Sequence, residues 1–156
     1  SGVDRATAKE FIDRYMHEFS GIAEYMQEMK DKVHKDGYVT TIFGRRRQLP
    51  EAFSGMPQLV SQAERMAINM PVQGTAADLI KLSMIQIHDL IHKEKAEKNI
   101  KLLLQVHDEL LFEAKNELVK EWSDKIKNIM ENIHKLDVPL TIDAKYGKNW
   151  AETEPV

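Results

Sequence analysis

The pattern of apolar and polar positions predicts a chain that begins with two helices. Apolar side chains recur every three or four residues through the first part of the sequence, which is the spacing of one helix face. They are Phe11, Ile12, Tyr15, Met16 and Phe19, followed by Ile22, Tyr25, Met26 and Met29. Asp4 or Thr7 can cap the first helix, and Gly37 ends the second. A stripe of methionine and aromatic residues is typical of a helix face that packs into the core.

The middle of the chain reads as a short strand followed by two helices. Residues 38–43 are β-branched and aromatic, which favours an extended segment. Capping-box spacing predicts one helix over residues 61–70 and another over residues 75–95. Pro71 lies between them and is expected to stop or kink the first helix, because proline lacks the amide donor.

Two apolar runs in the second half of the sequence predict a β-hairpin. The runs are Leu102–Val106 and Leu110–Phe112, and they flank His107, Asp108 and Glu109. Apolar runs on both sides of a short polar segment indicate two strands joined by a tight turn. Because the runs are nearly continuous, we expect the hairpin to be buried on both faces or nearly so.

The order of predicted elements favours the α+β class. A helix over residues 116–135 and a strand-like segment over residues 138–142 follow the hairpin. The chain therefore reads as an N-terminal helical segment and then helix, strand, strand, helix, strand. An antiparallel sheet with its helices packed on one face is the natural arrangement of these elements.

Composition narrows the functional classes. The chain has 156 residues, of which 42% are hydrophobic and 30% charged, as in a folded domain. Its formal net charge of −3 argues against binding nucleic acid by bulk charge, so any such contact must be local. The sequence has no cysteine, no apolar run near membrane-spanning length and no signal-peptide pattern, which fits a cytoplasm-like compartment. Because it starts with Ser, we expect a piece of a longer polypeptide.

The hairpin tip is a candidate metal site. Asp108 and Glu109 would place adjacent carboxylates at the end of an apolar sheet, where a divalent cation is the usual compensating charge. An ordinary polar turn explains the same residues, since Asp favours turns for backbone reasons. A second metal hypothesis is zinc at His88 and His92, which have helical i, i+4 spacing; Asp89 stands where the metalloprotease motif requires Glu, which argues against zinc.

Two groups of polar residues are candidates for nucleic-acid contact. Arg45, Arg46 and Arg47 form a dense positive cluster, which fits either phosphate contact or a solvated loop. Arg65, Asn69 and Gln73 are spaced by four residues, so on one helix they would form a row facing base edges and phosphates. Any solvated helix face has the same pattern, and Pro71 leaves open whether Gln73 keeps the helical register.

Four segments together resemble DNA polymerase family A, the bacterial DNA polymerase I group. They are residues 37–47 with Leu49 and Pro50, residues 63–81, residues 105–113, and residues 138–140 with Gly147, Asn149 and Trp150. The third segment, Gln-Val-His-Asp-Glu-Leu-Leu-Phe-Glu, is similar to the palm motif called motif C. The resemblance runs from about Val3 to Glu152 in the family's order and spacing.

The resemblance implies roles for individual residues. Asp108 is similar to the palm carboxylate that binds catalytic magnesium ions, with Glu109 as a supporting acid, and His107 to the residue facing the primer terminus. The row of Arg65, Asn69 and Gln73 matches residues that contact primer or template. The three arginines would contact phosphates or pair internally. The implied partners are primer–template DNA and deoxynucleoside triphosphates.

The resemblance also implies an incomplete polymerase. Residues 1–60 would be the end of the fingers and a connector, and residues 61–156 the second part of the palm. The family's second essential aspartate and its nucleotide-binding helix lie N-terminal to the match, so we expect this polypeptide to be inactive alone and to self-associate. The implied location is cytoplasmic and bacterial-type, with an organellar one left open. A non-catalytic nucleic-acid-binding or interaction module on a polymerase-like scaffold is the alternative.

Overall fold

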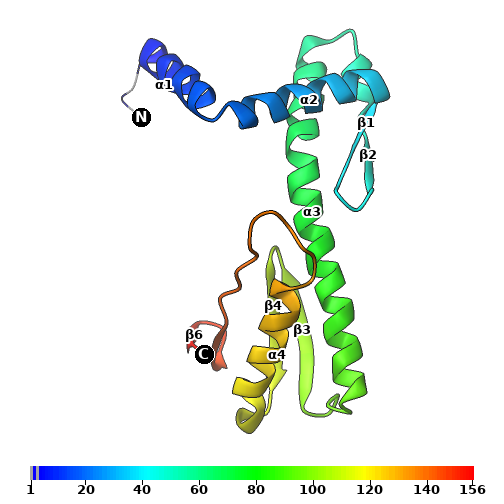
Figure 1. The fold of residues 1–156 in the computed structure, drawn as a ribbon, viewed down its shortest axis with the longest axis vertical. Helices are drawn as coiled ribbons and strands as arrows, with labels where there is room; N and C mark the ends of the chain where they lie inside the picture. The colour runs from blue at the N-terminus through cyan, green and yellow to red at the C-terminus, as the bar shows by residue number, and fades with distance from the viewer. Residues whose placement is uncertain (1, 3) are drawn as a thin grey trace. The chain divides into compact units, whose positions relative to one another are not determined.

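The computed structural model describes residue 2 and residues 4–156, which form two compact units. The first unit ends at Thr75, and the second runs from Ala76 to Val156 (Figure 1). The long helix α3, Pro57–Lys93, contributes its first half to one unit and its remainder to the other. We describe each unit by itself.

The first unit consists of helices and one small hairpin. It contains α1 (Arg5–Glu18), α2 (Ser20–Asp36), strands β1 (Tyr38–Thr40) and β2 (Arg46–Gln48), the 3-10 helix η1 (Pro50–Phe53) and the start of α3. The two predicted N-terminal helices are confirmed, and of the two candidate caps the structure selects Asp4. Its carboxylate accepts the backbone N–H groups of Ala6 and Thr7 at 2.8 and 3.0 Å. Gly37 ends α2 in the left-handed conformation, as predicted.

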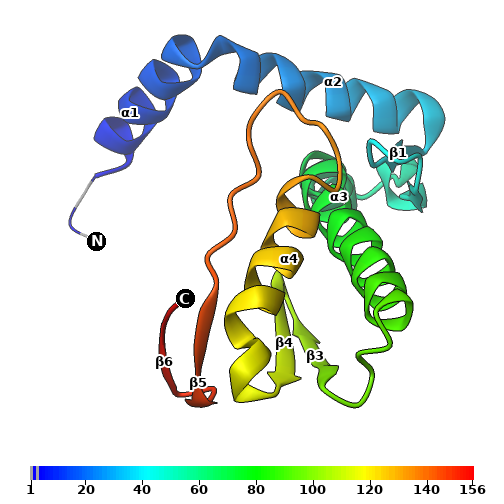
Figure 2. The ribbon, with the colours of Figure 1, turned by 60° about the horizontal axis from the view of Figure 1, so that its bottom comes forward.

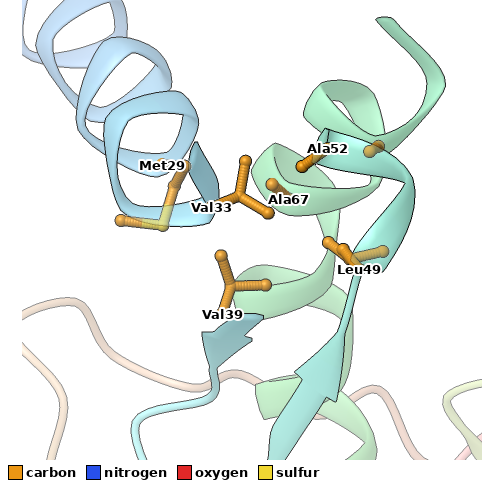
Figure 3. Close-up of a cluster of buried hydrophobic side chains, with 7 residues drawn as sticks. Met29, Val33, Val39, Leu49, Ala52 and Ala67 are labelled. Carbon is orange, nitrogen blue, oxygen red and sulfur yellow. The ribbon is translucent and has the colours of Figure 1, made fainter. Parts of the chain in front are cut away.

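A small apolar core holds the first unit together. It joins the end of α2, strand β1, the segment around η1 and one face of α3, whose side chains point toward one another (Figure 3). Its buried members are Met29, Val33, Val39, Leu49, Ala52, Ala63 and Ala67. Two polar contacts add to it: the Tyr25 hydroxyl donates to the carbonyl of Ile68 at 2.8 Å, and His34 pairs with Glu64 at 2.9 Å.

The apolar stripe of α1 lies outside this core, contrary to the prediction. No residue of α1 is buried, and Phe11 is 70% exposed. Tyr15 and Phe19 contact each other instead, with ring centroids 4.8 Å apart. Burial requires an opposing apolar surface, and among the described residues none covers this stripe.

Helix α3 corrects the predicted boundaries. It starts at Pro57, four residues before the capping box at Ser61, and it continues through Pro71. Proline is favourable in the first turn, where its missing N–H has no partner to lose. At Pro71 the missing donor leaves the Ala67 carbonyl without its helical bond, at a cost of about 3 kcal/mol. Burial of the Ala63–Ala67 face in the core offsets that cost, so the helix does not end there.

The second unit is built on the predicted hairpin. Strands β3 (Ile100–Val106) and β4 (Glu109–Ala114) pair antiparallel, with Val106 opposite Glu109. The 3-10 helix η2 (Asn116–Leu118), helix α4 (Val119–Glu131) and strands β5 (Lys145–Asn149) and β6 (Glu152–Pro155) follow. Figure 2 shows α4 lying along the hairpin. Residues from α3, the segment that follows it, β3 and α4 form the core, namely Ile87, Ile91, Ala96, Ile100, Trp122 and Met130.

The α+β class is confirmed, whereas two details of the predicted sheet are wrong. The described strands form three separate two-stranded sheets instead of one. The hairpin is also not buried on both faces, because Leu103 and Leu104 are 49% and 50% exposed. A β-bulge between Leu102 and Leu104 interrupts the alternation of the strand, and no third described strand covers its edge.

The predicted strand over residues 138–142 and the end of the last helix are wrong as well. Residues 138–142 carry no strand, because Pro139 lacks a ladder donor and the Ile142 N–H donates to the Glu131 side chain at 3.0 Å. Helix α4 ends at Glu131 and not near Lys135. The backbone N–H and the side-chain amide of Asn132 both donate to the Asn128 carbonyl, at 3.2 and 2.9 Å.

The Tyr25 contact makes the stability of the chain depend on pH. Burial, and then the negative charge of Glu28, raise the pKa of Tyr25 above the ordinary value of 10.0. Tyr25→Phe should therefore lower the free energy of unfolding by about 1 kcal/mol at pH 7, where the hydroxyl is protonated in both states. A raised folded-state pKa means that this contribution is lost as the pH rises above 10, so the two proteins should converge. Urea unfolding at pH 7 and above pH 10 measures both values, and a constant difference would contradict the assignment.

Candidate nucleic-acid interface and acidic turn

The predicted row of polar residues lies on one face of α3. Because α3 is continuous through Pro71, Gln73 keeps the helical register with Arg65 and Asn69, and all three side chains are exposed. They line a groove of about 370 Å³. The other lining residues are Arg47, Gln62, Met66 and Met70. The row therefore borders a concave surface and not a flat solvated face.

The arginine cluster lies on a hairpin beside that helix face. Arg46 and Arg47 belong to strand β2 and pair with Thr40 and Val39, so of the two open alternatives a solvated loop does not describe these two residues. The Arg46 guanidinium lies 4.8 Å from the centroid of the Tyr38 ring. A cation so placed over an aromatic ring is attracted to its negative face, which limits the freedom of the side chain.

The row and the cluster share one surface. A second groove, of about 460 Å³, is lined by Arg45, Arg46 and Arg47 together with Met70, Gln73 and Gly74. Arg47 and Gln73 line both grooves, and an Nη atom of Arg47 lies 3.6 Å from the Met66 sulfur. Four guanidinium groups thus border adjoining grooves in a chain of net charge −3.

The acidic residue that precedes Arg65 is directed away from the groove. Glu64 is the neighbour of Arg65 in sequence, but its carboxylate pairs with His34 of α2 at 2.9 Å and approaches the Lys30 ammonium at 3.9 Å. The groove face of α3 consequently presents amides and guanidinium groups. These donors suit phosphate oxygens and the acceptor atoms on base edges.

The acidic turn lies at the end of the β3–β4 hairpin in the second unit. His107 and Asp108 form the two-residue turn, and Glu109 opens β4. His107 has a φ of 53°, a left-handed conformation that costs about 1–2 kcal/mol for a residue with a Cβ. The Gln105 amide donates to the His107 carbonyl and braces the turn. Strain of this kind concentrates at functional sites.

The turn offers hard oxygen ligands to a cation. The side chains of Asp108 and Glu109 are both exposed, and magnesium is usually bound by one or two carboxylates together with waters and substrate phosphates. Within residues 4–156, no group of three or more His, Asp or Glu side chains is placed to hold a metal ion. The donor set therefore fits part of a magnesium site.

Among the residues that the structure describes, no third metal-binding side chain joins the histidine pair on α3 to form a metal site. The rings of His88 and His92 meet edge to face with centroids 4.3 Å apart, and His92 Nδ1 pairs with Glu97 at 2.8 Å. The pKa of Glu97 is lowered first by a backbone hydrogen bond and second by this hydrogen bond with His92. The contact with Glu97 at the end of α3 explains the position of His92 better than a zinc site does.

Sequence reasoning missed several groove residues. Gln62 precedes Arg65 by three positions and Asn69 by seven, so helical spacing could have found it. Met66 and Met70 carry neither charge nor amide, so residue type did not single them out. No spacing rule pointed to Gly74, because its contribution depends on which segment approaches the helix at that point.

Comparisons with known proteins show the family of the chain. The sequence profile of DNA polymerase family A matches residues 1–152, and the chain belongs to that family. It is 44% identical to DNA polymerase I of Bacillus subtilis over 155 residues and 40% identical to the thermostable DNA polymerase I of Thermus filiformis over 153. Each comparison covers 98% of this chain but only 17% and 18% of the relative, so the chain spans about a sixth of their length.

A solved structure has the same fold. The chain is similar to the polymerase domain of Pol1 from M. smegmatis, which was solved in complex with DNA primer–template and dNTP. The TM-score is 0.90 at 40% sequence identity, and the comparison covers 96% of this chain and 26% of the other.

Proposed function

We propose that this chain forms part of a DNA-directed DNA polymerase that extends a primer with deoxynucleoside triphosphates in replication and repair. One observation carries the proposal. The β1–β2 hairpin with Arg45, Arg46 and Arg47, here called the arginine hairpin, and the row of Arg65, Asn69 and Gln73 line adjoining grooves. Residues 1–60 belong to the end of the fingers and a connector, and residues 61–156 to the second part of the palm. Membership of family A and the DNA-bound structural neighbour support this assignment.

The two adjoining grooves, from here on called the groove, hold the last base pairs of a primer–template duplex. Arg45, Arg46 and Arg47 contact backbone phosphates, to which guanidinium forks are matched in shape and charge. The row on α3 contacts the minor-groove edges of the bases. Acceptor atoms there are nearly the same for all base pairs, so amide and guanidinium donors test the geometry of a pair without reading its sequence.

The acidic turn serves the chemistry of nucleotide addition. The primer 3′-hydroxyl attacks the α-phosphate of the incoming nucleotide, a P–O bond forms, and pyrophosphate leaves. Magnesium, when bound, would supply stabilisation of the negative charge that develops on the reacting oxygens. Asp108 and Glu109 would hold it with carboxylate oxygens from a turn that the hairpin keeps in place, while His107 lies beside the primer terminus. We place the polymerase in the cytoplasm, as for a bacterial-type enzyme.

A non-catalytic nucleic-acid-binding module is the second candidate. It is favoured by one observation, that the two carboxylates of the turn meet no third metal-binding side chain among the described residues. Both candidates use the groove, and they differ in whether the acidic turn takes part in synthesis.

Loss of a groove arginine should weaken DNA binding. Arg47→Ala is expected to lower the affinity for a primer–template duplex on the order of tenfold and to reduce the salt slope by about one, because one phosphate contact is lost. Fluorescence anisotropy over a salt series measures both quantities. Arg14→Ala removes the same charge from α1 and serves as the control. Equal effects of the two variants would show that the groove is not the binding surface.

The polypeptide alone should not synthesise DNA. Two carboxylates cannot complete a site for two ions, so we expect no template-dependent primer extension with magnesium and all four deoxynucleoside triphosphates. Gel-resolved extension beside an active family A polymerase tests this. Template-dependent products that disappear in Asp108→Asn and persist in Asp124→Asn would refute the predicted inactivity.

The exposed apolar side chains should make the chain self-associate. Phe11 and Phe19 in the first unit and Leu103 and Leu104 in the second are each about half exposed or more, and exposed apolar surface favours association. Light scattering across a concentration series should give a mass above that of the 18.0 kDa monomer. Phe11→Ser with Phe19→Ser should shift the mass toward the monomer. A monodisperse monomer for the unaltered chain at every concentration would contradict the proposal.

A further inference from the structure

We propose that Gly74 is a positioning residue for DNA binding, which seats the arginine hairpin against α3 and sets where the three arginines lie along the groove. The proposal rests on the DNA contacts proposed above. Gly74 lies inside α3, where glycine is among the least favourable residues. Its presence there has a steric explanation.

Gly74 allows a close approach between helix and hairpin. A Cβ atom at this position would lie 2.7 Å from the Cγ2 methyl of Thr41 and 3.4 Å from the Cε methyl of Met70. Carbon atoms at optimal contact are about 3.5–4.0 Å apart, so the Thr41 distance forces a displacement. Met70 can move because its side chain is flexible.

Thr41 cannot yield in the same way. It is 4% exposed, and its Oγ1 accepts the backbone N–H of Arg45 at 3.2 Å. The Thr41 N–H donates to the Arg45 carbonyl at 3.0 Å, and the Thr41 carbonyl accepts the Gly44 N–H at 3.0 Å. Rotating the β-branched side chain would break the Oγ1 bond, so the turn over residues 41–45 must move as a whole.

Movement of this turn carries the arginines with it. The turn joins β1 to β2, in which Thr40 pairs with Arg46 and Val39 with Arg47. It is also attached to α3 through the Ile42 N–H, which donates to Thr75 Oγ1 at 3.3 Å. A side chain at position 74 would therefore break that attachment and move the guanidinium groups away from the Gln73 side of the groove.

The chain offers a matched set of variants for the test. Gly74→Ala adds the clashing methyl, and Thr41→Ser removes the methyl that it meets while keeping the hydroxyl that accepts from Arg45. Gly21→Ala makes the same change inside α2, where a Cβ meets nothing within 4 Å. Helix propensity alone would make both alanine variants more stable, so a loss of DNA affinity confined to Gly74→Ala identifies the steric effect.

The main measurement is affinity for a primer–template duplex over a salt series. Gly74→Ala should bind on the order of tenfold more weakly with a shallower salt slope, because phosphate contacts are lost. Thr41→Ser with Gly74→Ala should restore both values, and Gly21→Ala should match the unaltered chain. The proposal is overturned if Gly74→Ala binds normally or if the double variant is no better than the single one.

A second measurement needs no DNA. Hydrogen exchange at the Ile42 amide should become faster in Gly74→Ala and return to its original rate in the double variant; unchanged exchange in Gly74→Ala overturns the proposal. If Gly74→Ala fails to fold, recovery of folding in the double variant supports the same clash, and failure of both overturns it. Absence of DNA binding by the unaltered chain would instead refute the proposed function, while the exchange experiment would still test Gly74.

Discussion

The packing of one face of α3 against α2 and the hairpin is the contact on which the first unit depends. Ala63 and Ala67 are small enough to let Val33, Val39 and Leu49 close over the helix, and all five are buried. This burial keeps the helix intact through Pro71, where the backbone loses a hydrogen bond. Without that continuity, Gln73 would leave the row formed with Arg65 and Asn69. Packing of the buried face of α3 into the core therefore keeps the Arg65, Asn69 and Gln73 row on its exposed face in register.

Among the described positions that depart from local preference, two lie at surfaces that the proposed function uses. His107 adopts a left-handed conformation at the acidic turn, and Gly74 lies inside the helix α3 at the groove, where glycine is unfavourable. Natural sequences usually agree with local preference except at functional or strained sites. The turn holds its carboxylates at the end of a hairpin, and the glycine admits a second element to the helix surface. The turn at His107 positions the negatively charged carboxylates, and Gly74 positions the positively charged arginines.

Much of this arrangement could be predicted from the sequence, because it depends on local patterns. The end of α2 at Gly37, the hairpin around His107 and the row on α3 each follow from spacing or turn chemistry that acts over a few residues. The errors came from contacts between distant segments. Pro71 reads as a helix end until the core of the first unit is known, and Ile142 reads as a strand residue until Glu131 is seen to take its N–H. The stripe with Phe11 reads as core because sequence alone does not show what opposes it.

The candidate site divides in the same way. Asp108, Arg65 and the arginine cluster were identified by residue type and spacing, and the family resemblance assigned their roles. The sequence did not show that Arg47 and Gln73 border the same grooves, since this requires the β1–β2 hairpin to pack beside α3. Gly74 escaped notice for the same reason.

The most direct test of the central claim is a map of the backbone amides that respond to DNA. Nuclear magnetic resonance spectra of the labelled chain, titrated with a short primer–template duplex, provide that map. The account predicts that shift changes centre on residues 45–47 and on residues 62–74 of α3, and that they weaken with added salt. Changes centred on α1 or α4 with a silent groove would contradict it.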